Sequence, residues 1–129
     1  MLQLERIIYP KIHSSINIQE EGSIEIENRM SLSVNFDKKN KKCIATFEIQ
    51  SICQAHVDWF SVEVQVVGAF SCGEMDSDDD KKRIHTEAYD TLFPYAQSMI
   101  SELTTKAGIV PLMLEKASIN FDEVVINKA

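Results

Sequence analysis

The first part of the chain alternates apolar and polar residues with a period of two. The alternation is clearest at 24–36, where most even positions are apolar and all odd positions are polar. Such a pattern is typical of a strand with one buried face. It recurs in three further segments, at 2–18, 43–56 and 59–72. The connections between the later segments are short and polar, so we predict an antiparallel meander.

The first of these segments contains Pro10. Proline has no backbone N–H to donate to a neighbouring strand, so we predict that 2–18 is an edge strand or a broken strand. By parity alone, the even positions form the apolar side of this segment: Leu2, Leu4, Ile8, Ile12, Ile16 and Ile18.

Helical spacing replaces the alternation in the second part of the chain. Apolar residues recur there three or four positions apart, at Leu92, Tyr95, Ala96, Met99, Ile100, Leu103 and Ala107. We predict a helix that is capped by Asp90 or Thr91, carries Pro94 in its first turn and ends at Gly108. Residues 73–83 are expected to form an acidic-then-basic loop before it. The final segment 121–128 is long enough for about two helical turns.

Strands followed by helices predict an α+β fold. We expect a four-stranded antiparallel sheet with one long helix and one short C-terminal helix on one face. The 129 residues suffice for one ordinary domain, 1–129.

Composition and charge narrow the function classes. The net charge of −7 disfavours nucleic acid and anionic membranes as partners. No apolar run approaches the ~20 residues of a membrane span, and the N-terminus does not resemble a secretory signal, so we expect a cytoplasmic protein without a membrane span. Cys43, Cys53 and Cys72 fit no zinc spacing, and we expect buried, reduced thiols.

Residues with catalytic or metal-binding potential form no convincing constellation. Asp76, Asp78 and Asp80 have the spacing of a calcium loop, but Lys81 stands where the sharp turn needs glycine. Cys53 and His56 are three residues apart and would point to opposite faces of a strand. We therefore expect no enzymatic activity, no cofactor and no metal.

Several large apolar residues lie outside the predicted core stripes. They include Tyr9, Trp59, Phe93, Leu112, Met113, Leu114 and Phe121. Two interpretations are open: these side chains cover sheet edges and helix ends, or they form a hydrophobic binding groove or an oligomer interface.

The helical segment contains Leu92-Phe93-Pro94-Tyr95-Ala96, which resembles the LFPYA motif of the SecB protein-export chaperone family. The resemblance extends to Arg6-Ile7-Ile8-Tyr9, Phe60, Glu63-Val64-Gln65, Gly68-Ala69-Phe70-Ser71, the segment from Gly108 to Leu114, and Asn120-Phe121-Asp122. It touches most of the chain and is densest from Trp59 to Asp122.

The resemblance implies an ATP-independent holdase that binds unfolded polypeptides for protein export and assembles as a dimer or tetramer. By position, it implies a client-binding groove that includes Trp59, Leu112, Met113, Leu114, Phe121 and Val125. It implies an oligomer-interface helix with Tyr95, Met99 and Leu103, and it makes Glu63 the candidate for docking to the translocase motor SecA.

Two alternatives from other functional classes stay open. The link 17–23 is shorter than the family's crossover loop, which favours an interaction module dedicated to one partner, such as an antitoxin. A small-molecule carrier or an enzyme with a pocket between sheet and helices is the other alternative.

Overall fold

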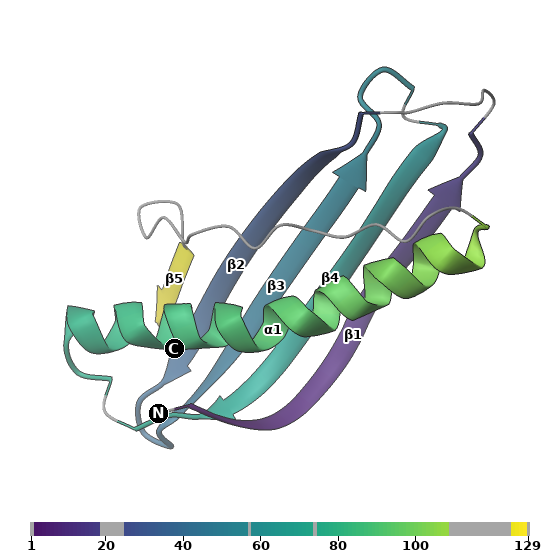
Figure 1. Cartoon of the computed structure of the whole chain (residues 1–129). Helices are drawn as coiled ribbons and strands as arrows, with labels where there is room; N and C mark the ends of the chain where they lie inside the picture. Colours follow the sequence, from purple (N-terminus) through teal and green to yellow (C-terminus); the bar gives the residue numbers. More distant parts are fainter. Residues whose placement is uncertain (1, 19–24, 57, 74, 109–124, 129) are drawn as a thin grey trace.

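A twisted sheet crossed obliquely by one long helix makes up the described part of the chain (Figure 1). The computed structural model describes residues 2–18, 25–56, 58–73, 75–108 and 125–128. The elements in chain order are β1 (Gln3–Ile16), β2 (Glu27–Asp37), β3 (Lys42–Ile52), β4 (Phe60–Ser71), α1 (Asp78–Lys106) and β5 (Val125–Lys128). The strand order is β1-β4-β3-β2-β5, with β1 to β4 antiparallel and β5 parallel to β2. The predicted α+β architecture of a four-stranded antiparallel sheet and a long helix is confirmed.

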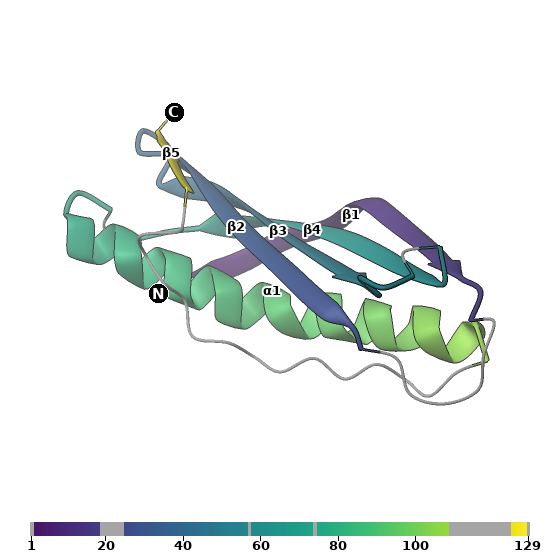
Figure 2. The same ribbon diagram turned by 90° about the horizontal axis from the view of Figure 1, so that it is seen from above.

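The alternation correctly predicts the buried faces of β2, β3 and β4. In β4 every even position is buried and every odd position is partly exposed. The buried side chains face α1, which lies on one side of the sheet, while no described element lies on the other side (Figure 2). The sheet therefore has one helix-covered face and one open face.

The parity prediction for the first strand is wrong between Leu4 and Lys11. The pairing of β1 with β4 shifts register between Leu4 and Arg6 and again between Ile8 and Lys11. As a result, Ile7 and Tyr9 pack partly against the core, whereas Ile8 is 42% exposed and lies on the open face. The second shift spans Pro10, which has no N–H for the ladder, so a bulge forms there and changes which residues face inward.

The long helix begins at Asp78, well before the predicted cap at Asp90 or Thr91. Ser77 caps it, because the Asp80 N–H donates to the Ser77 side chain and the Asp80 carboxylate accepts from the Ser77 N–H. The acidic stretch at 78–80 thus forms the first turn, where carboxylates stabilise the helix dipole, instead of a loop. Because the helix begins at Asp78, Pro94 lies inside it at an exposed position and not in its first turn, where the sequence predicted it. Gly108 follows the end of the helix with a φ of 82°, which confirms that prediction.

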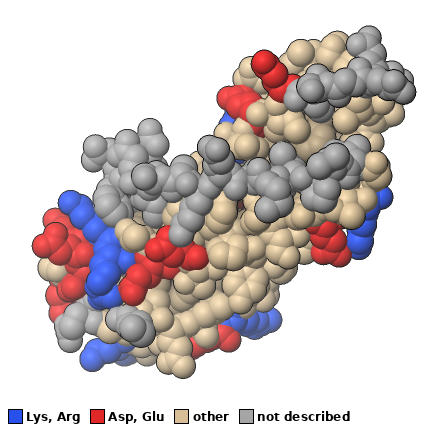
Figure 3. Space-filling view, viewed as in Figure 1, with Lys and Arg blue, Asp and Glu red and all other residues tan. Residues whose placement is uncertain are grey.

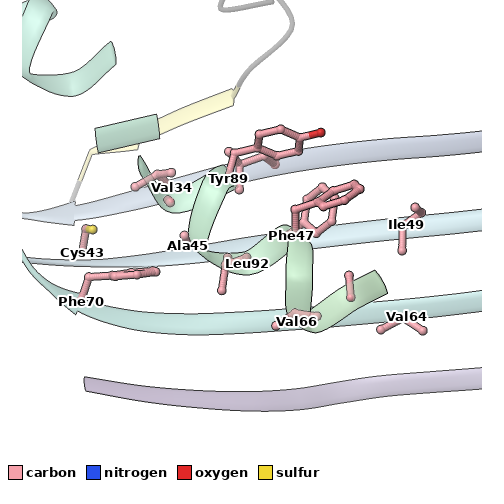
Figure 4. Close-up of a cluster of buried hydrophobic side chains, with 14 of the residues drawn as sticks. Val34, Cys43, Ala45, Phe47, Ile49, Val64, Val66, Phe70, Tyr89 and Leu92 are labelled. Carbon is pink, nitrogen blue, oxygen red and sulfur yellow. The ribbon is translucent and has the colours of Figure 1, made fainter. Parts of the chain in front are cut away.

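The core lies between α1 and the inner face of β2, β3 and β4 (Figure 4). Along α1, buried residues recur every four positions at Ile84, Ala88, Leu92, Ala96 and Ile100. Phe47 of β3 meets two helix rings, with its centroid 5.6 Å from that of Tyr89 and 6.4 Å from that of Phe93. This aromatic cluster joins the middle of the helix to the middle of the sheet.

All three cysteines are buried and free, as predicted. The Sγ atoms of Cys43 and Cys72 are 3.0 Å apart. Burial raises the pKa of both thiols. Both side chains therefore serve as small core residues and have little thiolate character.

The end of the chain differs from the predicted short helix. Val125–Lys128 form β5, which pairs with Ser33 to Phe36 of β2. β-Branched side chains at Val125 and Ile126 favour an extended backbone, and the edge of β2 offers unpaired backbone groups. The first part of the predicted final helix, at 121–124, lies outside the described residues.

Candidate functional site

An apolar surface forms where α1 passes β1. Tyr95, Met99 and Leu103 are four residues apart and share one side of the helix. Tyr95 is 40% exposed, while Met99 and Leu103 are partly buried against the core. Figure 3 shows charged side chains over the N-terminal half of α1 and mainly uncharged atoms over its middle. The three residues that the family resemblance implies for an interface helix thus lie together on one side of α1.

β1 extends this surface to the edge of the sheet. Burial raises the pKa of Tyr9, and the nearby Tyr95 and Glu102 add to that rise. Ile12 pairs with the inward-facing Val64 and is 45% exposed. We call Tyr9, Ile12, Tyr95, Met99 and Leu103 the α1–β1 surface. Within the described residues, the outer edge of β1 has no partner strand, so backbone groups are also available beside this surface.

Trp59 is the predicted groove residue for which the structure describes both backbone and side chain. Its ring stacks on that of His56 with centroids 3.8 Å apart and an interplanar angle of 12°. The Asn17 N–H donates to the Trp59 carbonyl over 2.8 Å, which ties the end of β1 to the turn between β3 and β4. Trp59 is half-buried and lies at this end of the sheet.

The other groove residues stay predictions. Val125 belongs to β5, whose backbone alone is described. Leu112, Met113, Leu114 and Phe121 lie outside the described residues.

Glu63 lies on the open face of the sheet, beside a cation. The Lys11 Nζ donates to Glu63 Oε1 over 2.8 Å, across β1 and β4. This hydrogen bond lowers the pKa of Glu63. The candidate docking acid is therefore ionised but already paired, which the sequence alone does not indicate because Lys11 and Glu63 are far apart along the chain.

Replacing Lys11 with Met should lower stability slightly near neutral pH and not in acid. Because the folded-state pKa of Glu63 lies below its ordinary value of 4.5, the ion pair stabilises above that value. The contribution is lost as the pH falls through the lowered pKa. Urea unfolding at about pH 7 and about pH 3 measures the difference. In a Glu63→Gln background the same substitution should have no effect at either pH; an equal loss at both pH values would contradict the assignment.

None of the described helices is both long and apolar enough to cross a bilayer. Among the described residues, no group of three or more His, Cys, Asp and Glu side chains gathers to hold a metal ion. The arrangement offers surfaces for binding: the α1–β1 surface, the region of Trp59, and the open face of the sheet.

Comparison with known proteins gives a consistent result. The family model for SecB, described as preprotein translocase subunit SecB, matches residues 3–129. The protein-export protein SecB of Orientia tsutsugamushi (strain Boryong) is 28% identical over 123 residues, covering 92% of this chain and 64% of the relative. That of Cellvibrio japonicus is 27% identical over 121 residues, covering 91% and 60%. The chain thus spans less than two thirds of the length of these relatives.

A solved structure supports the fold. It is the Mycobacterium tuberculosis Rv1957 SecB-like chaperone in complex with a ChAD peptide from the Rv1956 HigA1 antitoxin. It superposes with a TM-score of 0.70 at 14% identity and covers 90% of each chain.

Proposed function

The chain belongs to the SecB family, and we propose that it is a chaperone that holds unfolded polypeptides without ATP and without chemistry. The family match over 3–129 carries this proposal. The exposed apolar side chains support it, since a holdase must offer apolar surface to clients that have lost their own core. We propose that clients destined for export bind a groove that includes Trp59, Leu112, Met113, Leu114, Phe121 and Val125.

The α1–β1 surface is proposed as the main contact between subunits. Tyr95, Met99 and Leu103 offer an apolar helix face, and the outer edge of β1 offers backbone donors and acceptors. Pairing through both would give a dimer or tetramer that presents several grooves to one client. Linked weak contacts of this kind raise affinity without any strong single site.

We do not propose that SecA docks at Glu63. A cationic docking segment would have to compete with Lys11, whose Nζ is 2.8 Å from the carboxylate. SecA stays a partner implied only by the family resemblance.

The test is binding of the purified chain to a permanently unfolded polypeptide, such as a reduced and alkylated protein, measured by calorimetry. We expect binding to the unfolded form, no binding to its native counterpart, and no effect of ATP. Trp59→Ala should weaken binding by about tenfold, as expected for a buried aromatic contact. Gln54→Ala, in the same turn, should not. Absence of binding by a folded, oligomeric preparation would refute the general holdase.

A dedicated interaction module is the second candidate. The observation that favours it is the solved SecB-like chaperone at TM-score 0.70, which is bound to an antitoxin peptide. On this proposal the chain binds one cognate protein saturably and ignores generic unfolded chains. A pull-down for one stoichiometric partner would separate the two candidates.

A further inference from the structure

The open face of the sheet carries an apolar patch that neither the α1–β1 surface nor the groove uses. Ile8 is 42% exposed and Ile44 is 49% exposed, and both belong to this face. Val67 and Ala69 of β4 lie between them and are partly exposed. We call Ile8, Ile44, Val67 and Ala69 the outer patch. No described element covers it (Figure 2).

The register shows that the outer patch occupies two rows across the sheet. One row runs Arg6, Ala69, Ile44 and Asn35, and the other runs Ile8, Val67, Thr46 and Ser33. Between them lies the row Ile7, Gly68, Ala45 and Val34, whose side chains face α1. On β2 the patch is continued by short polar side chains, so a flat partner can approach closely.

Charges flank the outer patch on both sides, along β1 and along β3. On β3, Lys42 lies three residues before Ala45 and Glu48 lies three residues after it. On β1, Glu5 lies before Ile8 and Lys11 lies after it. Glu5 accepts hydrogen bonds from Lys42, at 3.1 Å, and from Ser71, so it lies on the same face as the patch. β3 therefore has a cation at one end of the patch and an anion at the other. β1 has Glu5 and Arg6 at one end and Lys11 at the other.

This order of charges matches the same surface on a second copy of the chain. If a second copy packs face to face about a two-fold axis along the row Ile7, Gly68, Ala45 and Val34, the two rows of the outer patch exchange places. Lys42, which pairs with Glu5 of its own chain, then also meets Glu48 of the second copy. Lys11, which pairs with Glu63 of its own chain, also meets Glu5 of the second copy. Val67 meets Ala69, Ile44 meets Thr46, and Ile8 meets the aliphatic part of Arg6. A two-fold axis along β4 would instead bring Lys42 to Glu5 and Glu48 to Lys11 of the second copy, so charge changes at positions 42 and 48 distinguish the two axes.

We propose that two copies of this chain associate through the open faces of their sheets about this two-fold axis. Isologous contacts need a self-complementary surface, which the order of charges around the outer patch supplies. Sheets that pack face to face lie about 10 Å apart, so the isoleucine side chains would interdigitate. The two patch rows and the charged row on either side of them span roughly 500 Å² per copy at normal strand spacing. This is below the roughly 800 Å² of a standard interface, so the association should be weak and concentration-dependent.

Charge reversal gives a sharp test. Lys42→Glu places a second carboxylate against Glu48 of the other copy, and Glu48→Lys places a second ammonium group against Lys42 of the other copy. Each variant alone should associate at least about tenfold more weakly than the native chain in sedimentation equilibrium. An equimolar mixture should recover the native association, because positions 42 and 48 again carry opposite charges at every contact between the two different variants. Failure of the mixture to recover it would overturn the proposed axis.

Ile44→Asp tests the apolar part of the same interface. We expect loss of the concentration-dependent step, whereas Gln50→Asp, on the same strand and face but beyond the charged rows, should leave it intact. The proposal would be overturned if the mass of the native chain in sedimentation equilibrium did not rise with protein concentration. So would an Ile44→Asp chain that loses affinity for unfolded polypeptide while its self-association is unchanged, since the face would then serve a foreign partner. None of these variants touches Trp59 or the α1–β1 surface, so failure here does not bear on the holdase proposal.

Discussion

Phe47→Ala should lower the free energy of unfolding by about 3–5 kcal/mol, the range for truncating a buried aromatic residue. Phe47 is 1% exposed and lies in the middle of β3. Its ring contacts Tyr89 and Phe93 of α1, and the pairs add to the area that Phe47 buries. The substitution would leave a cavity at the contact between helix and sheet that neighbouring strands cannot close.

The measurement is chemical denaturation followed by circular dichroism, with Ile44→Ala as the matched control. Ile44 lies on the same strand and is 49% exposed on the open face, so its truncation should cost well under 1 kcal/mol at low protein concentration. Since small domains are stable by only about 5–15 kcal/mol, the Phe47 variant should also unfold at much lower temperature. Equal losses in the two variants would contradict the placement of α1 over β3.

Gly68→Ala should destabilise the chain by about 1–3 kcal/mol, although it adds only one methyl group. A Cβ at Gly68 would lie 2.8 Å from Phe70 Cε2 and 2.9 Å from Leu92 Cδ2, closer than real Cβ atoms approach other carbons. The opposing gain, from a less flexible unfolded chain, is only about 0.4–1 kcal/mol. β4 and α1 can therefore approach this closely because residue 68 has no side chain.

Gly73→Ala provides the matched control for this overpacking. A Cβ there would meet nothing within 4 Å, so the same substitution should be neutral or slightly stabilising. Urea unfolding of the two variants measures the difference directly. A Gly68→Ala chain as stable as the Gly73→Ala chain would show that Phe70 and Leu92 shift without cost.

The sequence predicts those parts of the fold where one local pattern decides the outcome. Strict alternation identifies β2, β3 and β4, because their two faces differ in burial along the whole strand. The alternation gives the wrong facing in part of β1, because a bulge changes which side chains face inward without changing the hydrophobic pattern. Pro10 indicates that a bulge is near but not which residues change sides. The start of α1 escapes prediction because the acidic run at 78–80 resembles a solvated loop unless Ser77 is recognised as its cap.

The candidate site also has one part that the sequence predicts and other parts that it does not. Helical spacing alone places Tyr95, Met99 and Leu103 on one side of α1, so sequence suffices for that part of the surface. The Lys11–Glu63 ion pair and the outer patch depend on which residues of β1, β3 and β4 stand opposite one another. That register is set by tertiary contacts and not by any one segment.

The position of β1 has a consequence for the order in which the chain folds. β2, β3 and β4 follow one another as hairpins, so their contacts close short loops. β1 pairs with β4, joining Gln3 to Ser71 and Ile16 to Phe60, and these contacts cannot form until most of the sheet has been synthesised. Because loop closure over a long separation costs more entropy, we expect the meander to assemble first and β1 to dock afterwards. The strand of this sheet that is synthesised first would then be among the last to find its partner, and its apolar residues would stay exposed throughout that interval.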